Sequence, residues 1–585
     1  MKNIKIILSS IFLFLSANSY AQAQSKLIGF DKDGRLVYHP YTEQGDIIPD
    51  FSYCGYMGGG IAIPDVEVVA VIGSPSGLEN DAPMIQHVID SVSQLRTNHY
   101  GFRGAILVKK GTYKIGVPLK LEASGIILRG EGNTVNGTVL LATSPKKYSV
   151  IEIGKNIRPV RIASTEKNIS DNYVPSGTRI IHVDKAEEFF KTGEYVIVQR
   201  PSTAEWIHGI GMDSILPRPR KGETPQDVLQ RFRETKGKTD MNGTQQWEPG
   251  SKDVRYERRI IGVKGNEITL DVPITNALQK EYGGAKVYKY TFEQRIKQCG
   301  IENIYGMSVF DETVTEKNKF GNEDVYFSDE KHANIFANFL AVENAWIRNV
   351  NVEHFDYCVS TALYAKYITC QDLSAINPIS QITGGRRYAY SISGQMNLFQ
   401  RCYAKEHRHA FILQSSVAGP NAFVDSRGEE SYASSEPHQR WSTGCLFDNI
   451  EIDGPEACLS ASNRGNMGSG HGWSGAQMVF WNCKAPFIFV MQPPTAQNFA
   501  IGCVGTNDKW SEDIRNKIIR YANNATGSDL EYTDKNVGGT GWIESIDKNV
   551  LPQSLYYQQL KDRLGNQALQ SVMTEIQMDK FFNKK

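Results

Sequence analysis

Short apolar runs of strand length recur through the second half of the chain, and this repeat limits the possible fold more than any other feature. The runs lie at 397–404, 421–426, 444–453, 478–483 and 499–505. Equivalent positions in them, spaced by 25, 23, 33 and 20 residues, are Arg401, Ser426, Asn449, Asn482 and Gly502. The runs alternate with period two and lack a long 3.6-residue pattern. A repeat of this length with insertions between strands is typical of a solenoid, so the sequence predicts an all-β chain folded as a parallel β-helix.

A predicted helix and two strands precede the repeat. Apolar residues recur at helical spacing within 77–95, and Asn80 or Asp81 is suited to cap that helix. The strand sequences ILVKKGTY and ILRGEG follow. This order resembles the N-terminal end of pectate-lyase-superfamily proteins, and the resemblance covers residues 50–140 and 300–506. It implies a right-handed parallel β-helix whose open N-terminal end is capped by the helix, which keeps the coil edge from pairing with another chain.

Changes of pattern divide the chain into five parts. Residues 1–23 combine a basic start, an apolar stretch and small residues, which predicts a secretory signal and a periplasmic or extracellular protein. The other parts are an N-terminal region with the first coils, an inserted β unit, the main β-helix and a helical C-terminal cap, at 24–179, 180–295, 296–510 and 511–585. A polar loop at 203–256 interrupts the insertion, and loops of this length are usually functional or mobile. We expect it to act as a lid over a groove.

Charge and cysteine usage narrow the functional class. Lys plus Arg equals Asp plus Glu, 64 against 64, so no net field favours nucleic acid as a partner. No run after the signal approaches the roughly 18 apolar residues of a membrane span. The expected state is a monomer. Nine cysteines are present, and Cys402, Cys483 and Cys503 occupy equivalent strand positions, which predicts buried, unpaired thiols stacked in the core.

Histidine and arginine gather in the turns between the repeated strands. Four of the 11 histidines lie between residues 407 and 471. Because a solenoid stacks successive turns about 5 Å apart, turns distant in sequence can share one groove. The predicted catalytic residues are His409, His438, Arg440, Arg464 and His471. β-Elimination beside a uronate needs a cation for the carboxylate, a base and an acid. We assign Arg440 and Arg464 to the carboxylate and His409 or His438 to the base, with histidine or tyrosine as the acid.

Further side chains are candidates for substrate contact. Arg408 adjoins the histidines, and Arg387 and Tyr388 precede the next strand. Tryptophan can stack on a sugar ring, and core packing is the alternative for each one. The predicted substrate-binding residues are Arg408, Trp441, Trp473, Arg387, Tyr388 and Trp206, with Trp247 as a further sugar contact in the loop.

The leading hypothesis is a polysaccharide lyase that acts on an acidic glycan. A glycoside hydrolase needs two facing carboxylates, and the sequence leaves open which of several acidic residues could pair: Glu353, Asp356, Glu406, Asp425, Glu429, Glu430 and Asp448. A non-catalytic glycan-binding protein is the third reading. No cofactor is predicted, and Cys/His metal spacing is absent from the sequence. Calcium stays an open alternative, although the nearest acidic stretch, 323–330, reads as a solvated loop.

Overall fold

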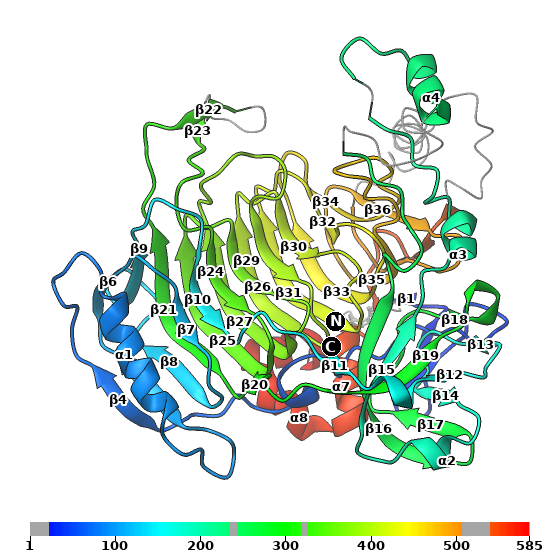
Figure 1. Ribbon diagram of the computed structural model, residues 1–585, viewed down its shortest axis with the longest axis horizontal. Coiled ribbons are helices and arrows are strands. Elements are labelled where there is room, and N and C mark those ends of the chain that lie inside the picture. The colour runs from blue at the N-terminus through cyan, green and yellow to red at the C-terminus, as the bar shows by residue number, and fades with distance from the viewer. Residues whose placement is uncertain (1–22, 219, 235–242, 319–324, 506–538, 584–585) are drawn as a thin grey trace, which may run out of the picture.

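The chain folds into a right-handed parallel β-helix, as the sequence predicts (Figure 1). A computed structural model describes residues 23–218, 220–234, 243–318, 325–505 and 539–583. One side of the solenoid, here called the short-strand sheet, consists of β7 (Leu119–Leu121), β10 (Ser149–Ile153), β24 (Ile335–Phe339), β26 (Tyr357–Thr361), β28 (Tyr388–Ile392), β30 (His409–Leu413), β32 (Ser434–Pro437), β34 (Cys458–Ala461), β36 (Ile488–Gln492) and the last, antiparallel β38 (Gly539–Thr540).

The remaining coil sides belong to a sheet of longer strands. Its main members are β4 (Val68–Ile72), β5 (Gly104–Val108), β8 (Ile126–Gly130), β21 (Gly300–Ser308), β25 (Val342–Glu353), β27 (Lys366–Ile376), β29 (Leu398–Lys405), β31 (Asn421–Glu429), β33 (Ser442–Ile452), β35 (Gly475–Trp481), β37 (Phe499–Ile501) and β39 (Trp542–Glu544). Three short strands pair at its N-terminal end: β6 (Gly111–Ile115), β9 (Thr138–Ala142) and β20 (Ile296–Lys297).

The long strands bend at one column of residues with left-handed backbone. The column runs through Asn303, Asn349, Asp372, Arg401, Asp425, Asn449 and Asn482, with φ between 46° and 57°, and ends at Gly502 with φ 69°. Most are Asn, Asp or Gly, the residues that adopt this conformation at least cost. The repeat read from sequence therefore marks a corner of the coil. In β31 the corner is Asp425, one residue before Ser426, the position chosen from the sequence.

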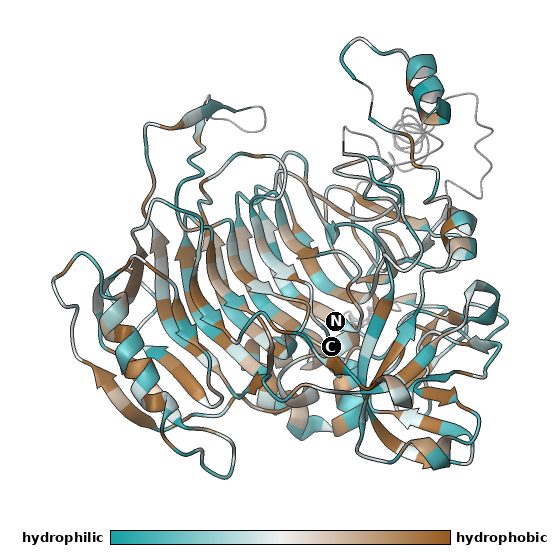
Figure 2. Ribbon diagram, viewed as in Figure 1, coloured by the Kyte–Doolittle hydropathy of each residue, from teal (hydrophilic) through white to brown (hydrophobic). Residues whose placement is uncertain are grey.

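The interior of the solenoid is filled by stacked apolar side chains. Phe399, Phe423, Phe447 and Phe480 form a ladder with ring centroids 4.8–5.3 Å apart. Figure 2 shows hydrophobic and hydrophilic bands alternating along the solenoid strands. All nine cysteines are free, and Cys402, Cys483 and Cys503 are buried in this core, which confirms the predicted unpaired thiols.

Helices cover the solenoid at two places. Helix α1 (Ala82–Ser93) packs Ile85, Ile89 and Val92 into the core beside the first strands, as predicted. Helices α7 (Leu555–Leu564) and α8 (Asn566–Val572) confirm the helix predicted over 554–569, and α9 (Glu575–Met578) follows. They pack along the flank formed by β29, β31, β33 and β35. The other predicted helix, 511–525, lies outside the described residues, as does most of the signal segment.

The insertion leaves the solenoid after β10 and returns at β20 and β21. It begins at Val160 rather than at residue 180, because β11 already pairs with β19. Its sheet comprises β11 (Val160–Arg161), β12 (Lys167–Asn168), β14 (Ile180–His182), β15 (Tyr195–Arg200), β16 (Val254–Lys264), β17 (Glu267–Leu270) and β19 (Lys286–Thr291). Helix α2 (Ala186–Phe189) adjoins this sheet. The long loop is not structureless, since it contains α3 (Ala204–Gly209) and α4 (Pro225–Glu234). No helix in the described ranges is both long and apolar enough to cross a membrane.

Candidate functional site

The structure brings the predicted histidines together on the outer side of the short-strand sheet. His409 begins β30, His438 directly follows β32, and His471 lies in the turn between β34 and β35. The ring centroids of His409 and His438 are 5.1 Å apart, and those of His438 and His471 are 4.9 Å apart. Stacking of successive turns produces this proximity, as the sequence argument expected.

Three further residues complete the site, here called the histidine cluster: Tyr388, His409, Glu436, His438, Arg464 and His471. Tyr388 begins β28, one rung before His409, and its ring centroid lies 4.8 Å from that of His409. Glu436 projects outward from β32 and accepts a hydrogen bond from Arg464 Nη1. Sequence reasoning missed Glu436. The available signal was its position two residues before His438 on a short strand, which places both side chains on one face.

Hydrogen bonds indicate the proton positions on two histidines. His409 Nδ1 faces the carbonyl oxygen of Ser434, so it carries a proton and donates it, which leaves Nε2 buried without a hydrogen-bond partner among the described residues. His438 Nδ1 lies 2.7 Å from Arg464 Nη1. His438 Nδ1 also lies 3.1 Å from Glu436 Oε1, but the contact with the arginine is the shorter one. Because a guanidinium only donates, the arginine contact favours a proton on His438 Nε2, which lies 3.1 Å from the Tyr388 hydroxyl. Tyr388 in turn donates to the Gly384 carbonyl at 3.1 Å.

Burial and positive charge keep these histidines neutral. Burial lowers the pKa of His409 and His438 well below the usual value; for His438 the charge of Arg464 adds to this effect. Burial, with Arg464 next, lowers the pKa of His471 to about 2. The pKa of Tyr388 is raised, mainly by burial and against the opposing charge of Arg408. At neutral pH the cluster therefore contains neutral imidazoles and a protonated phenol.

Three members of the cluster also have the donor types of a metal site. Ligand atoms of His409, Glu436 and His438 lie within 4.8 Å of one another. Arg464 Nη1, however, contacts both Glu436 and His438 Nδ1. A guanidinium thus supplies positive charge where a cation would approach these donors.

Four predicted sugar contacts, all tryptophans, are wrong. The side chains of Trp206, Trp441 and Trp473 are completely buried, and Trp247 is also buried. Trp206 packs edge-on against Trp441 at 4.8 Å, and Trp473 Nε1 donates to the Ile210 carbonyl. These rings form the apolar core where the insertion packs against the solenoid. They are therefore unable to stack on a sugar in this arrangement.

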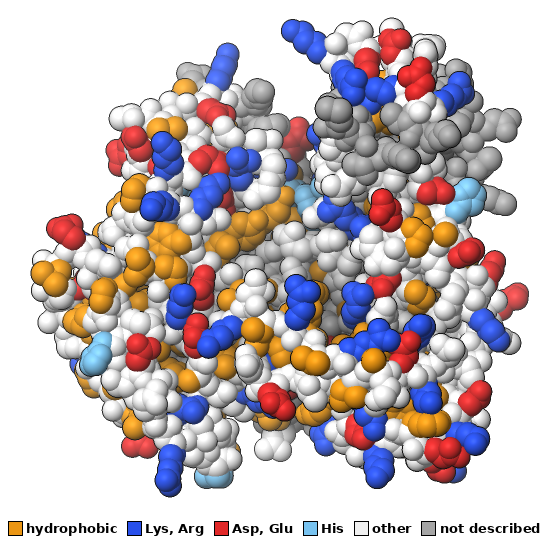
Figure 3. Space-filling view, in the orientation of Figure 1, with side chains coloured by type: hydrophobic (Ala, Val, Ile, Leu, Met, Phe, Trp, Pro, Cys, Tyr) orange, Lys and Arg blue, Asp and Glu red, His pale blue; other side chains and the backbone are white. Residues whose placement is uncertain are grey.

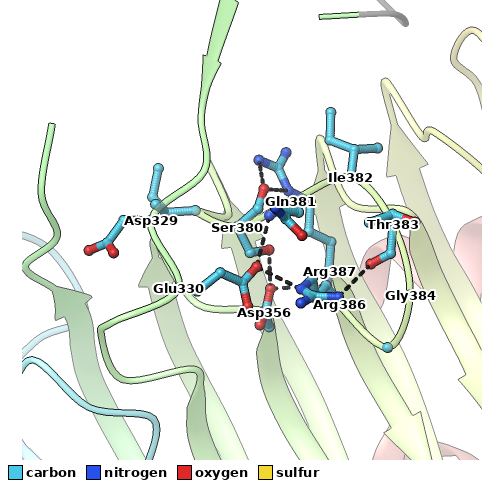
Figure 4. Close-up of polar contacts among 12 residues, drawn as sticks. Asp329, Glu330, Asp356, Ser380, Gln381, Ile382, Thr383, Gly384, Arg386 and Arg387 are labelled. Atoms are coloured by element: carbon cyan, nitrogen blue, oxygen red, sulfur yellow. Dashed lines mark hydrogen bonds and ion pairs between the residues drawn. The ribbon is translucent and has the colours of Figure 1, made fainter. Parts of the chain in front are cut away.

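The loop after β27 covers the cluster and corrects the role of Arg387. Arg387 was predicted to bind substrate, but it is buried and its guanidinium donates to the carbonyls of Ser380 and Phe327. Asp356 accepts from the Ser380 hydroxyl and the Arg387 backbone, and Glu330 pairs with Arg386 (Figure 4). These contacts fix both ends of the loop. Its exposed tip, Thr383–Gly385, presents the Gly384 carbonyl to Tyr388 and Arg408.

Cations lie on both sides of the histidine cluster. Arg464 is not free for a substrate carboxylate, since Glu436 and His438 already engage it. Arg408 and Arg440 are partly exposed, and the described residues include no carboxylate within ion-pair distance of either. Figure 3 shows a hollow in this face between the lobe that carries β22 (Thr315–Lys317) and β23 (Val325–Phe327) and the lobe that carries α4. The hollow lies above β30 and β32.

The carboxylates considered for a hydrolase have other partners. Asp425 binds Lys580 and Gln577, and Asp448 accepts from the Ser554 hydroxyl at 2.7 Å. Both therefore hold the C-terminal helices against the solenoid. Glu353 accepts from the Tyr305 hydroxyl. Among the described residues, only Glu436 brings a carboxylate into hydrogen-bonding contact with the histidine cluster.

Comparison with known proteins yields distant structural similarity. No family model and no curated protein matches the chain. The tailspike protein gp49 from Pseudomonas phage LKA1 aligns over 72% of this chain with 12% identity and TM-score 0.36. The tailspike of Escherichia coli bacteriophage HK620 in complex with a pentasaccharide aligns over 74% with 8% identity and TM-score 0.32. The chain spans only 56% and 55% of these two tailspikes. A variant of DFA-IIIase from Arthrobacter chlorophenolicus A6 in complex with DFA-III aligns over 83% of this chain and 95% of its own, with 8% identity and TM-score 0.29.

Proposed function

We propose that this protein is an exported carbohydrate-active enzyme that cleaves a uronate-containing polysaccharide by β-elimination at the histidine cluster. The observation that carries this proposal is the contact between the Tyr388 hydroxyl and His438 Nε2, set between Arg408 and Arg440, which have no acidic partner among the described residues. The pair offers proton transfer, and the arginines offer charge for an anionic sugar. Export rests on the signal-like segment 1–23 alone.

The chemistry assigns one role to each group. Arg408, whose guanidinium carbon is 5.8 Å from the centre of the Tyr388 ring, neutralises the uronate carboxylate and so acidifies the adjacent C–H bond. His409 is the base, because its Nδ1–H is held by Ser434 and its Nε2 lone pair is free. The substrate C–H electrons form the new carbon–carbon double bond as the glycosidic C–O bond breaks. Tyr388 gives its proton to the leaving oxygen, and His438 Nε2–H stabilises the resulting phenolate.

Substrate charge matters for the strength of the base. The lowered pKa of His409 makes it a weak base in the free protein, with burial as the main cause and Arg408 next. A bound carboxylate beside Arg408 would offset that positive charge and move the histidine pKa upward. The base is thus strengthened when an anionic substrate binds.

Access to the cluster requires movement of the covering loop. Tyr388 is 3% exposed and His409 is 1% exposed, so a sugar cannot reach either group while the loop tip stays in place. Besides the contacts of the Gly384 carbonyl, the tip is held by hydrogen bonds from the Tyr357 hydroxyl to the Gly385 carbonyl at 3.2 Å and from Arg386 to the Thr383 carbonyl at 3.4 Å. Binding of the glycan at Arg408 would replace the Arg408–Gly384 contact and release this tip.

The test is product analysis with a panel of uronate glycans. We expect ultraviolet absorbance from unsaturated sugar ends with the native protein. Tyr388→Phe should reduce it by about 10²-fold or more, because general-acid groups typically contribute 10²–10⁴-fold. Tyr403→Phe is the matched control, since Tyr403 bonds Glu429 away from the cluster. New reducing ends without unsaturation would identify a hydrolase, and binding without turnover would identify a glycan-binding protein. Either result would overturn the lyase proposal.

A further inference from the structure

One cation of the insertion lies beside the arginine that follows His438. Lys252 is in the turn that leads into β16, and the positive charge of Arg440 contributes to a lowered pKa of Lys252, second only to burial. The contacts of Arg440 with Ser469, and of Lys252 with the Trp247 ring that bonds Gly470, place both residues at one turn although 188 positions separate them. Arg440 belongs to the solenoid and Lys252 to the insertion, so folding of the insertion onto the solenoid brings them together.

The surrounding contacts hold both cations at the same seam. Arg440 Nη2 donates to the Ser469 carbonyl and hydroxyl. The next carbonyl, of Gly470, accepts from Trp247 Nε1 at 3.3 Å, and Lys252 Nζ lies 5.8 Å from the Trp247 ring centroid. The backbone of Lys252 is fixed by the Ser202 hydroxyl at 3.0 Å. The seam therefore positions two partly buried cations around one turn of the solenoid.

Neither cation has an anionic partner in the part of the chain that the structure describes. Lys252 Nζ donates to Ser251, and Arg440 Nη1 donates to the Gln439 side chain. No ion pair involves either residue among the described ranges, although the charge of Glu248 reaches Lys252. Two like charges in a partly desolvated place repel each other, and a bound anion would turn this cost into a favourable interaction.

We propose that Lys252 and Arg440 form a second anionic subsite, built across the seam, that binds a carboxylate or sulfate on a sugar next to the one held at Arg408. This inference rests on the proposed function and deepens it. The substrate would be a chain with negative charge on successive or alternating sugars. The insertion would then contribute to substrate choice, and through Lys252 rather than through its tryptophans.

The experiment measures binding of oligouronates of increasing length, and of a sulfated oligosaccharide, to Tyr388→Phe by calorimetry. The comparison is with Tyr388→Phe carrying Lys252→Met, and with Lys264→Met in the same background as control, since Lys264 is an exposed lysine at the end of β16. We expect Lys252→Met to weaken binding of longer charged oligosaccharides by about tenfold, as charge-assisted contacts of this size imply. Carboxyl-reduced oligosaccharides should bind both proteins equally. The anion that the subsite binds is identified by which oligosaccharide, the uronate or the sulfated one, loses affinity in Lys252→Met.

Several outcomes would overturn the subsite. These are unchanged affinity in Lys252→Met, an equal loss for carboxyl-reduced chains, or no binding of any charged oligosaccharide. The two proposals fail separately. If charged chains bind through Lys252 but the native protein does not cleave them, the subsite proposal stands and the lyase proposal is wrong. Cleavage that is independent of Lys252 would do the reverse.

Discussion

Two buried clusters of polar side chains lie near the place where the insertion packs against the solenoid. They differ in how their acidic and basic groups are balanced. The first joins the insertion to the solenoid and consists of Glu257, Tyr290, Arg295, Glu343 and Lys366. Arg295 contacts Glu257 at 2.6 Å and Glu343 at 3.3 Å, and Tyr290 donates to Glu257 at 3.0 Å. Lys366 lies 3.9 Å from Glu257. Two acids thus face two bases in this junction network.

The histidine cluster has no such balance. Within the described ranges, one carboxylate, Glu436, faces Arg464 and three histidines, while Arg408 and Arg440 lie nearby without an acidic partner. In the junction network, burial is the largest single effect on Arg295 and lowers its pKa, but Glu257, Tyr290 and Glu343 together outweigh burial and raise the pKa of that guanidinium. In the histidine cluster, burial prevails and the imidazoles stay neutral. A matched network holds elements together, whereas an unmatched one keeps proton-transfer atoms and cations available to a ligand.

The largest expected effect is on stability in the junction network. Arg295→Met removes the partner of a buried carboxylate, and we expect the free energy of unfolding to fall by about 3–5 kcal/mol. Turnover per folded molecule should stay unchanged. Denaturant unfolding measures the first quantity. Lys484→Met breaks an exposed pair with Glu451 and should cost only about 0–1 kcal/mol. A small loss of unfolding free energy in Arg295→Met would show that this network is not what joins the insertion to the solenoid.

The next effect is on turnover in the histidine cluster. His438→Gln removes the group that stabilises the Tyr388 phenolate, and we expect turnover to fall by about 10²–10³-fold, the size seen when one donor to a developing anion is lost. Stability should change little, because glutamine can still accept from Arg464. His208→Gln is the control, since His208 is exposed on α3. Full activity in His438→Gln would place the chemistry outside this cluster.

The smallest effect near neutral pH is on the dependence of stability on pH. Burial lowers the pKa of His407 to about 3, with Arg387 as the next cause, whereas an unfolded histidine titrates near 6.5. As pH falls, the unfolded state binds the proton before the folded state does. The stabilising contribution of this neutral histidine is therefore full above pH ~6.5 and is lost as pH falls below that value. Each histidine of this kind should contribute about 1.4 kcal/mol per pH unit between its two pKa values.

The slope of unfolding free energy against pH measures that contribution. His407→Gln should flatten the slope between pH ~6.5 and ~4 by the amount that the binding of one proton contributes. His99→Gln, an exposed substitution near α1, provides the comparison. An unaltered slope in His407→Gln would mean that His407 is not held neutral in the folded protein.

The sequence by itself determined the solenoid and the gathering of histidines. Period-two runs show which residues face a core, and the spacing of Asn449 and Asn482 marks equivalent corners, because each coil must return to the same place to stack. The helix at 82–93 was readable for the same reason, since its periodicity is local. Stacked turns then brought His409, His438 and His471 within contact of one another without further information.

Only the tertiary structure decided which of these side chains are available. Trp441 and Trp473 are buried because the insertion packs over them, and nothing near them in sequence announces that partner. Arg464 is bound by Glu436 from another turn, and Arg387 is used to fix its own loop. Burial and pairing depend on contacts between segments far apart in the chain, whereas periodicity reports only on neighbours. Lys252 and Arg440, brought together across the seam, illustrate the same dependence.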